Sequence, residues 1–326
     1  MSGNSYVLSA DVGGTNLRVA AVDRGGNILN QTTRLTPRTG DAEEIVDAII
    51  AACESCLSEL SPTETPLGFG LALAALVHPS EGRIYSSPNL PQLDGVPLAK
   101  LVAERLETQV VLENDATAAA IGEHWLGASR GIANSVSLTI GTGIGGGLIL
   151  NNEPYRGVIG TAGELGHICV EADGHPCGCG SHGCLEQYAS ATAVVRIARD
   201  LAKAGVSTLD LRRDFTAKDV YQAAVAGDSV AIDAFRTMGR YLGIALADII
   251  NVLNPELVVL AGGGAGAWDF FIDTTSAEMK KRAFAQPADA VRIVRASLGG
   301  TAGLVGAARV AFSLSADPSD SRQSAE

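Results

Sequence analysis

The stretch that decides the fold runs from Tyr6 to Val22 and reads YVLSADVGGTNLRVAAV. Residues 6–10 and 17–22 are short apolar runs of the kind that form buried strands. Between them, Asp11-Val12-Gly13-Gly14-Thr15-Asn16 carries the paired glycines of a tight turn. The stretch therefore predicts two strands joined by a glycine turn, and Arg24-Gly25-Gly26-Asn27 predicts a further turn into a third strand.

The same local design recurs near the middle of the chain. Residues 135–140 form an apolar run, Gly141-Thr142-Gly143-Ile144-Gly145-Gly146-Gly147 predicts a turn, and residues 148–150 predict the returning strand. The segments between show helical periodicity or further apolar runs. We expect helices at 42–60, 97–106, 115–126, 191–204, 217–226 and 230–253, and strands at 67–71, 110–112 and 257–261. This alternation predicts an α/β fold with antiparallel hairpins added to largely parallel sheets.

Length and charge narrow the class of protein. A chain of 326 residues exceeds the roughly 250 to 300 at which single cores stop growing, so we expect two domains. The net charge of -12 argues against nucleic acid or an anionic membrane as the main partner, because both are bound by clustered Lys and Arg. The polar N-terminus predicts no signal peptide, and no stretch approaches the ~20 apolar residues of a membrane span. We expect a cytoplasmic enzyme.

The two glycine turns are candidate phosphate sites, since free backbone N–H groups in such turns face anions. Residues 141–146 match GxGxxG, but a strand follows where a dinucleotide-binding fold needs a helix, which argues against a nicotinamide site. The chain contains no GxxxxGK[ST] motif of the P-loop folds. A third glycine cluster, 262–266, follows the strand at 257–261, and we leave open whether it receives an adenine ring or only turns the chain into a helix.

The segment Glu113-Asn114-Asp115 is placed where a strand ends and a helix begins. Asp115 has two interpretations: an N-cap, which Asp fills well, or a general base that accepts the proton of an attacking hydroxyl. An N-cap at Asp115 would leave Asn114 unexplained. With Asn89, Glu164 and Glu186, these residues supply enough donors and acceptors for a ligand with many hydroxyl groups, each of which must be paired when buried.

A metal site is predicted downstream. Cys177, Cys179 and Cys184 lie in a glycine-rich loop with the spacing of zinc ligands, and His167 is the expected fourth ligand. His175 and His182 are alternatives, but their short tethers to the thiolates make a good tetrahedron harder. A disulfide would need an oxidising compartment. A closed Cys3His site is structural, so we expect the metal to fix Glu164 and Glu186 on either side of it.

The sequence resembles the ROK family (repressors, open reading frames, kinases), and within it the bacterial glucokinases, from Asp11 to about Ala308. The resemblance rests on Asp11-Val12-Gly13-Gly14-Thr15, Glu113-Asn114-Asp115, Gly163-Glu164-Leu165-Gly166-His167 and the Cys177, Cys179, Cys184 and Glu186 signature. It implies the two-domain actin-like ATPase (ribonuclease H-like) fold, with a cleft between the domains and a structural zinc loop. It also implies ATP and Mg2+ in that cleft.

The resemblance implies a role for each residue by its motif position. Asp115 would be the general base for the sugar 6-hydroxyl, and Asp11 would organise Mg2+. Residues implied to hold the sugar are Asn89, Asn114, Glu164, His167 and Glu186, with His167 also bound to zinc. Residues implied to line the nucleotide are Gly13, Gly14, Thr15, Gly141, Thr142, Gly143, Gly263 and Gly264.

We therefore expect an ATP-dependent hexose kinase, with glucose as the first candidate acceptor and homodimers or homotetramers as assemblies. The small domain is expected at 1–116, with 303–315 packing back on it, the large domain at 117–302, and a frayed tail at 316–326. Fructose, N-acetylmannosamine, N-acetylglucosamine, allose and a donor other than ATP stay open. Ala74-Ala75 stands where the family usually has Pro-Gly, which leaves a sugar sensor without kinase activity as an alternative. A DNA-binding repressor is not expected, because Asp11 leaves no room for a preceding helix-turn-helix.

Overall fold

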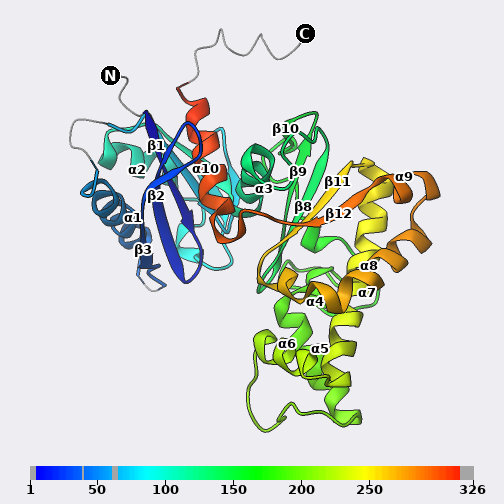
Figure 1. The fold of residues 1–326 in the computed structure, drawn as a ribbon. Helices are drawn as coiled ribbons and strands as arrows, with labels where there is room; N and C mark the ends of the chain where they lie inside the picture. The colour runs from blue at the N-terminus through cyan, green and yellow to red at the C-terminus, as the bar shows by residue number, and fades with distance from the viewer. Residues whose placement is uncertain (1–4, 39, 61–64, 316–326) are drawn as a thin grey trace.

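The computed structural model describes residues 5–38, 40–60 and 65–315. Within this part of the chain, two five-stranded sheets stand side by side with helices around and between them (Figure 1). A separate two-stranded hairpin consists of β5 (Leu76–His78) and β6 (Arg83–Ser86). None of the helices in the described ranges is long and apolar enough to cross a membrane.

The first sheet has the strand order β3-β2-β1-β4-β7. Its strands are β1 (Tyr6–Val12), β2 (Asn16–Asp23), β3 (Ile28–Leu35), β4 (Phe69–Leu73) and β7 (Val110–Asn114). The hairpin pairs β1–β2 and β2–β3 are antiparallel, whereas β4 pairs with β1 and β7 in parallel. The first glycine turn joins β1 to β2, as the sequence predicts.

The second sheet repeats this plan in the order β10-β9-β8-β11-β12. Its strands are β8 (Ser135–Ile140), β9 (Ile144–Leu150), β10 (Glu153–Pro154), β11 (Leu257–Ala261) and β12 (Arg292–Arg295). Three strands again form antiparallel hairpins, and β11 pairs in parallel with β8 and β12. The second glycine turn joins β8 to β9, at the position equivalent to the first.

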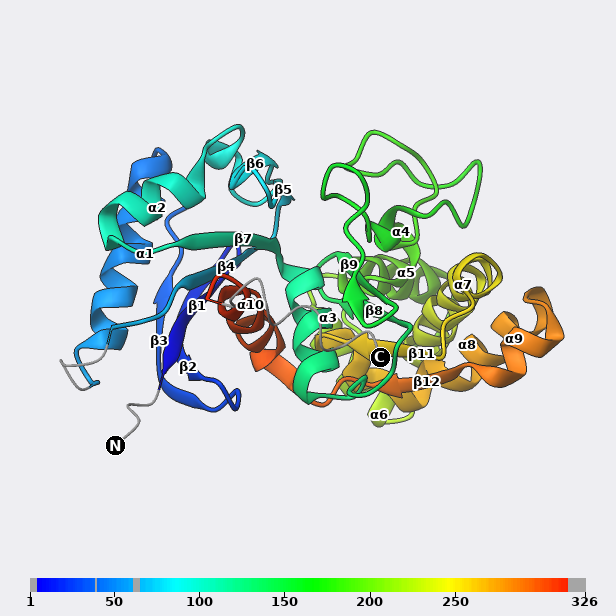
Figure 2. The same ribbon diagram turned by 90° about the horizontal axis from the view of Figure 1, so that it is seen from above.

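Helices cover both sheets. They are α1 (Ala42–Leu57), α2 (Leu98–Leu106), α3 (Asp115–Leu126), α4 (Glu186–Ala189), α5 (Ala191–Ala204), α6 (Ala217–Val225), α7 (Ser229–Leu253), α8 (Trp268–Arg282), α9 (Ala285–Ala290) and α10 (Ala302–Ser313). Figure 2 shows α3 and α10 between the two sheets, and these helices pack on each other. The chain crosses from the first sheet to the second through α3 and returns through α10.

Each sheet has its own hydrophobic core. One core gathers β1, β2, β4, α1 and α2, and the other gathers β8, β9, β11, α5 and α7. A smaller cluster, which includes Val7, Val22 and Phe312, fixes α10 to the first sheet. Two cores agree with the expected two domains. The boundaries at 116 and 302 remain predictions, and the expected frayed tail at 316–326 lies outside the described residues.

One predicted turn was too long. The sequence pattern extended the second glycine turn to Gly147, but β9 already begins at Ile144. Gly145 and Gly147 lie within this strand against α3, where a Cβ would stand 2.6 Å from Ala116 Cβ and 2.5 Å from Ala120 Cβ. These glycines therefore allow the helix to approach the strand closely, and the turn itself is confined to residues 141–143.

Candidate functional site

The first glycine turn borders an open hollow of about 500 Å³. Its lining residues are Asp11, Gly13, Gly14, Thr15, Asn16, Arg18 and Thr33. Gly14 faces Asn89, because a Cβ built on this glycine would lie 3.0 Å from Asn89 Cβ. Asn89, expected to contact the sugar, thus lies next to the first predicted phosphate site.

Asp11 forms an ion pair with Arg18 across the β1–β2 hairpin, where the two residues are register partners. Burial raises the pKa of Asp11, and the Arg18 charge opposes this shift. Arg18 Nη1 also donates a hydrogen bond of 2.5 Å to Gly300 O, just before α10. Arg18 therefore brings positive charge to the hollow and connects it to the segment that returns from the second sheet.

The second glycine turn contacts Glu186. A Cβ on Gly143 would lie 2.3 Å from Glu186 Oε2, and the Ile144 N–H donates to the same oxygen at 3.0 Å. Thr142 is exposed, and its carbonyl accepts a hydrogen bond of 2.8 Å from Thr192 Oγ1 on α5. This side of the site thus joins a predicted phosphate turn to a predicted sugar-binding acid.

Asp115 is the first residue of α3, but Asn114 is the N-cap. Asn114 Oδ1 accepts the Thr117 N–H at 3.0 Å, which satisfies a free donor of the first helical turn. The interpretation of Asp115 as the N-cap was therefore wrong, because its carboxylate does not cap the helix. Asp115 Oδ1 accepts the N–H of Ala116 at 2.8 Å.

The pKa of Asp115 is raised to about 7, first by burial and then by the negative charges of Asp11 and Glu164. Asp11 belongs to the first glycine-turn motif, and Glu164 belongs to the segment before the zinc loop. Both carboxylates therefore lie near enough to Asp115 to act on its charge. A carboxyl group with this pKa can accept a proton at neutral pH and hold it.

Ala74-Ala75 lies beside Asn114. Asn114 Nδ2 donates to Ala75 O at 3.2 Å, and Ser87 Oγ donates to Ala74 O at 3.1 Å. Neither alanine has a positive φ, and Ala75 is buried. The backbone conformation at these two positions therefore does not require glycine. Asn114 thus has protein partners on both ends of its amide and one N–H left for a ligand.

Glu164 and His167 precede the metal loop and Glu186 follows it, yet His167 and Glu186 both lie near enough to Glu164 to act on its charge. Burial raises the pKa of Glu164, the neighbouring His167 lowers it, and the carboxylate of Glu186 raises it further. His167 Nε2 lies 3.8 Å from Glu164 Oε2. Residues that are up to 22 positions apart in sequence are thus close enough to contact one small polar ligand together.

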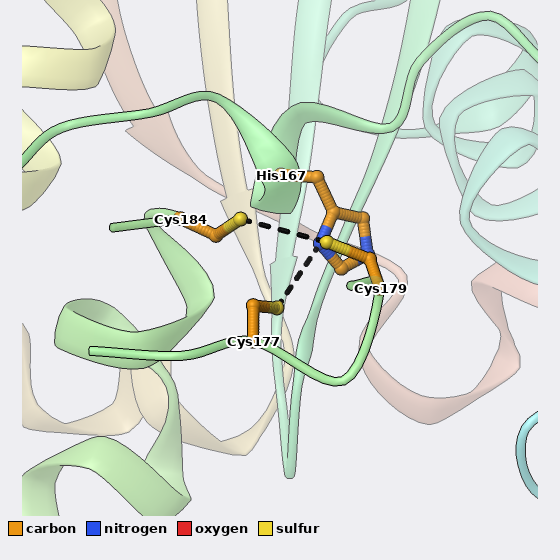
Figure 3. Close-up of side chains that lie close together, drawn as sticks. All are labelled: His167, Cys177, Cys179 and Cys184. Carbon is orange, nitrogen blue, oxygen red and sulfur yellow. Dashed lines mark hydrogen bonds between the residues drawn. The ribbon is translucent and has the colours of Figure 1, made fainter. Parts of the chain in front are cut away.

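The predicted metal ligands form a compact group. His167, Cys177, Cys179 and Cys184 place one ligand atom each within 4.8 Å of all the others (Figure 3). Cys177 Sγ lies 3.5 Å from His167 Nδ1, and Cys179 Sγ lies 3.7 Å from Cys184 Sγ. His175 lies outside this group, with Nε2 2.5 Å from Arg196 Nη1, and His182 also lies outside it.

These distances fit a tetrahedral zinc ion. Zn–S bonds of about 2.3 Å and Zn–N bonds of about 2.0 Å give tetrahedral edges of about 3.8 Å between sulfurs and about 3.5 Å between sulfur and nitrogen. The sulfur separation of 3.7 Å is far too long for the ~2.05 Å bond of a disulfide, and all six cysteines are free. Gln187 Nε2 donates to Cys177 Sγ at 3.7 Å, as an outer-shell partner would.

The third glycine cluster forms a short 3-10 helix, Gly263–Ala267, beside the second glycine turn. Gly262 has φ +82 and packs on Ile140 O, 2.4 Å from where its Cβ would be. Gly263 and Gly266 have no atom of the described chain within 4 Å of a Cβ position. The cluster therefore contains both a tight turn and an open surface. A turn into a helix and a surface for an adenine ring are thus compatible interpretations.

Comparison with known proteins agrees with the repeated sheets and the gathered motifs. The sequence profile of the ROK family matches residues 7–313. The chain belongs to the ROK family. A glucokinase of Halalkalibacterium halodurans is 37% identical over 94% of this chain and 94% of its own length.

Solved structures of ROK proteins share the fold. A ROK family glucokinase from Streptomyces griseus, in complex with glucose and AMPPNP, has a TM-score of 0.81 and 35% identity over 95% of this chain and 100% of its own. The family also includes regulators: a xylose repressor of Bacillus subtilis is 29% identical over 92% of this chain and 75% of its own length. The expected actin-like α/β fold is therefore confirmed.

Sequence reasoning on this ROK chain missed Arg18 and Glu113. Arg18 could have been found from the hairpin itself, because β1 and β2 joined by a tight turn place it directly opposite Asp11. Glu113 was quoted as part of a motif without a role. Its partner is 43 positions away in sequence, so no local pattern pairs the two.

Proposed function

We propose that the protein is an ATP-dependent hexose kinase, and that glucose is its acceptor. The observation that carries this proposal is Asp115, a carboxyl group at the start of α3 whose pKa is raised to about 7 by burial and by the charges of Asp11 and Glu164. The glucokinases among the relatives, one of them solved with glucose and an ATP analogue, support the same activity.

ATP would lie between the two turns. The backbone of Gly13, Gly14 and Thr15, which lines the hollow, would face its phosphates from the first sheet, and that of residues 141–143 would face them from the second. The backbone at Gly263 and Gly264 would receive the adenine. Gly263 is open, whereas Gly264 packs against Ile140, with its Cβ position 2.3 Å from Ile140 Cγ2. Asp11 offers a carboxylate oxygen of the kind that holds Mg2+, which when bound neutralises phosphate charge.

The sugar would lie between Asn89, Asn114 and the acids Glu164 and Glu186, with His167 on the side of the metal loop. Asp115 would accept the proton of the 6-hydroxyl as that oxygen attacks the γ-phosphate, and ADP would leave. A base of this kind contributes about 10²- to 10⁴-fold to the rate. Closure of the cleft would exclude water, which competes for the same phosphoryl group.

The four ligands His167, Cys177, Cys179 and Cys184 fit zinc in number, type and spacing. A zinc ion there would have no open position and would serve structure alone. His167 would present Nδ1 to the metal and Nε2 to the sugar side, where Glu164 lies. The metal would thus orient His167 and Glu164 toward the sugar without contacting the reacting atoms.

A panel of hexoses tests the proposal. ADP release is measured with ATP or polyphosphate as donor and glucose, fructose, N-acetylmannosamine, N-acetylglucosamine or allose as acceptor. Glucose with ATP should give the highest kcat/KM. A different best sugar would keep the kinase and reject glucokinase. Sugar binding without release of ADP would instead indicate a sensor, a possibility that the related xylose repressor keeps open.

A further inference from the structure

Glu113 is a buried carboxylate at the end of β7, and it is 2% exposed. Its Oε2 accepts a hydrogen bond of 2.7 Å from Arg156 Nε and forms an ion pair with Nη2 of the same guanidinium at 2.6 Å. Its Oε1 accepts the backbone N–H of Asn114 at 3.1 Å. Both carboxylate oxygens are thus paired, and the buried charge depends on Arg156.

The two partners come from different sheets. Glu113 belongs to β7 at the edge of the first sheet, and Arg156 follows β10 at the edge of the second. Figure 2 shows the loop after β10 rising beside β5 and β6. The ion pair therefore connects the sheets next to the point where α3 crosses between them.

A second contact holds the same loop. The Ala162 N–H donates to Arg156 O at 3.0 Å, which closes residues 156–162 into a compact turn. Gly160, with φ +87, lies against the segment that follows β4, because a Cβ there would stand 2.4 Å from Pro79 Cδ and 3.1 Å from Val77 O. The loop is thus fixed to the first sheet at Arg156 and to the β5 segment at Gly160.

Functional residues lie on both sides of this connection. Asn114 and Asp115 follow Glu113 directly, and Glu164 comes two residues after the closed turn ends at Ala162. Gly163, with φ +99, packs on Gly146 O of β9, where a Cβ would lie at 2.9 Å, so the short link to Glu164 has little freedom. Any shift of Arg156 would move Glu164 relative to Asp115.

We propose that Arg156 is a positioning residue for the sugar, and that its pairing with Glu113 sets the separation between Glu164 and Asp115. This inference rests on the proposed function, because it assigns the sugar to these two acids. The pair lies on the sugar side of the site and touches none of the residues proposed for the nucleotide. Its loss should therefore weaken sugar binding and leave nucleotide binding unchanged.

The test replaces both partners, since removal of Arg156 alone would leave an unpaired buried charge. Sugar and AMPPNP binding to Glu113→Gln/Arg156→Met are measured by calorimetry, together with KM for each substrate. We expect the sugar Kd to rise at least tenfold while the AMPPNP Kd changes less than twofold. The exposed pair Arg236–Asp233 on α7, changed to Gln and Asn, is the matched control and should alter neither.

Arg156→Lys provides a second measurement that does not depend on the folding of the double variant. Lys keeps the charge but lacks the planar guanidinium, whose Nε and Nη2 both approach Glu113 Oε2, so the sugar Kd should rise at least threefold. An unchanged sugar Kd in this variant, or equal weakening of sugar and nucleotide binding, would overturn the proposal. If wild-type protein binds sugar without transferring phosphate, the proposed function fails, and the calorimetry still decides the role of Arg156.

Discussion

Replacement of Cys179 by Ser should remove zinc and weaken sugar binding. Cys179 Sγ lies 3.7 Å from Cys184 Sγ in the metal group and is exposed, so the substitution leaves the hydrophobic core intact. Three remaining ligands would hold the metal far less tightly, because a hydroxyl does not replace a thiolate on zinc. Without the metal, the loop that contains Cys177 and Cys184 loses its cross-link, and His167 loses the partner of Nδ1.

The size of the effect follows from the groups that the metal orients. His167 and Glu164 lie 3.8 Å apart and would each contribute a hydrogen bond to the sugar. At about 1 to 1.5 kcal/mol for each bond, their loss costs about 2 to 3 kcal/mol, which corresponds to a rise in the sugar KM of about 30- to 150-fold. The KM for ATP should change little, since neither residue belongs to a glycine turn.

The assay combines zinc content by elemental analysis with steady-state kinetics. Cys169→Ser is the matched control: Cys169 is also exposed and pairs by a backbone bridge with Cys184, but it lies outside the ligand group. It should keep one zinc per chain and an unchanged sugar KM. A zinc-free Cys179→Ser protein with the wild-type sugar KM would show that the metal does not orient the sugar-binding groups.

Two further predictions concern the acids and the second glycine turn. The raised pKa of Asp115 means that its contribution to stability is complete below pH 3.8 and is lost as the pH rises to about 7. Relative to wild type, Asp115→Asn should therefore gain about 3 kcal/mol in free energy of unfolding between pH 5 and pH 8 in urea titrations, and a gain as large for exposed Asp273→Asn would argue against this cause. Gly143→Ala should raise the KM for ATP at least tenfold and disturb the sugar KM as well, because the added Cβ would lie 2.3 Å from Glu186 Oε2. Gly178→Ala, with no atom of the described chain within 4 Å of its Cβ, is the control, and equal kinetics for the two variants would contradict the role of the turn.

Local sequence signals predicted much of the fold. The expected bounds of α3, α5, β8 and β11 agree with the structure, because each has a cap, a turn or an uninterrupted apolar run at its ends. Helix α8 was missed since its exposed face is polar and its apolar side packs on α7. Strand β12 was missed since Arg292–Arg295 is a short edge strand with charged ends, whose pairing with β11 is visible only in three dimensions.

In the site, too, local patterns predicted some features, and others depend on how distant segments pack. Motif spacing predicted the metal group because three of its ligands lie within eight residues of one another. The sequence offered an N-cap as one of two interpretations of Asp115, whereas Asn114 is the cap, since Asn and Asp are both good caps and spacing alone does not choose between them. The Glu113–Arg156 pair depends on how two sheets meet, which no local pattern contains.

The most direct test of Asp115 as the general base is phosphoryl transfer by Asp115→Asn. Wild-type and variant protein receive γ-labelled ATP and glucose in a single turnover, and glucose binding is measured separately by calorimetry. The variant should bind glucose with nearly wild-type affinity and transfer label to the sugar about 10²- to 10⁴-fold more slowly. Transfer at a substantial fraction of the wild-type rate would contradict this role of Asp115.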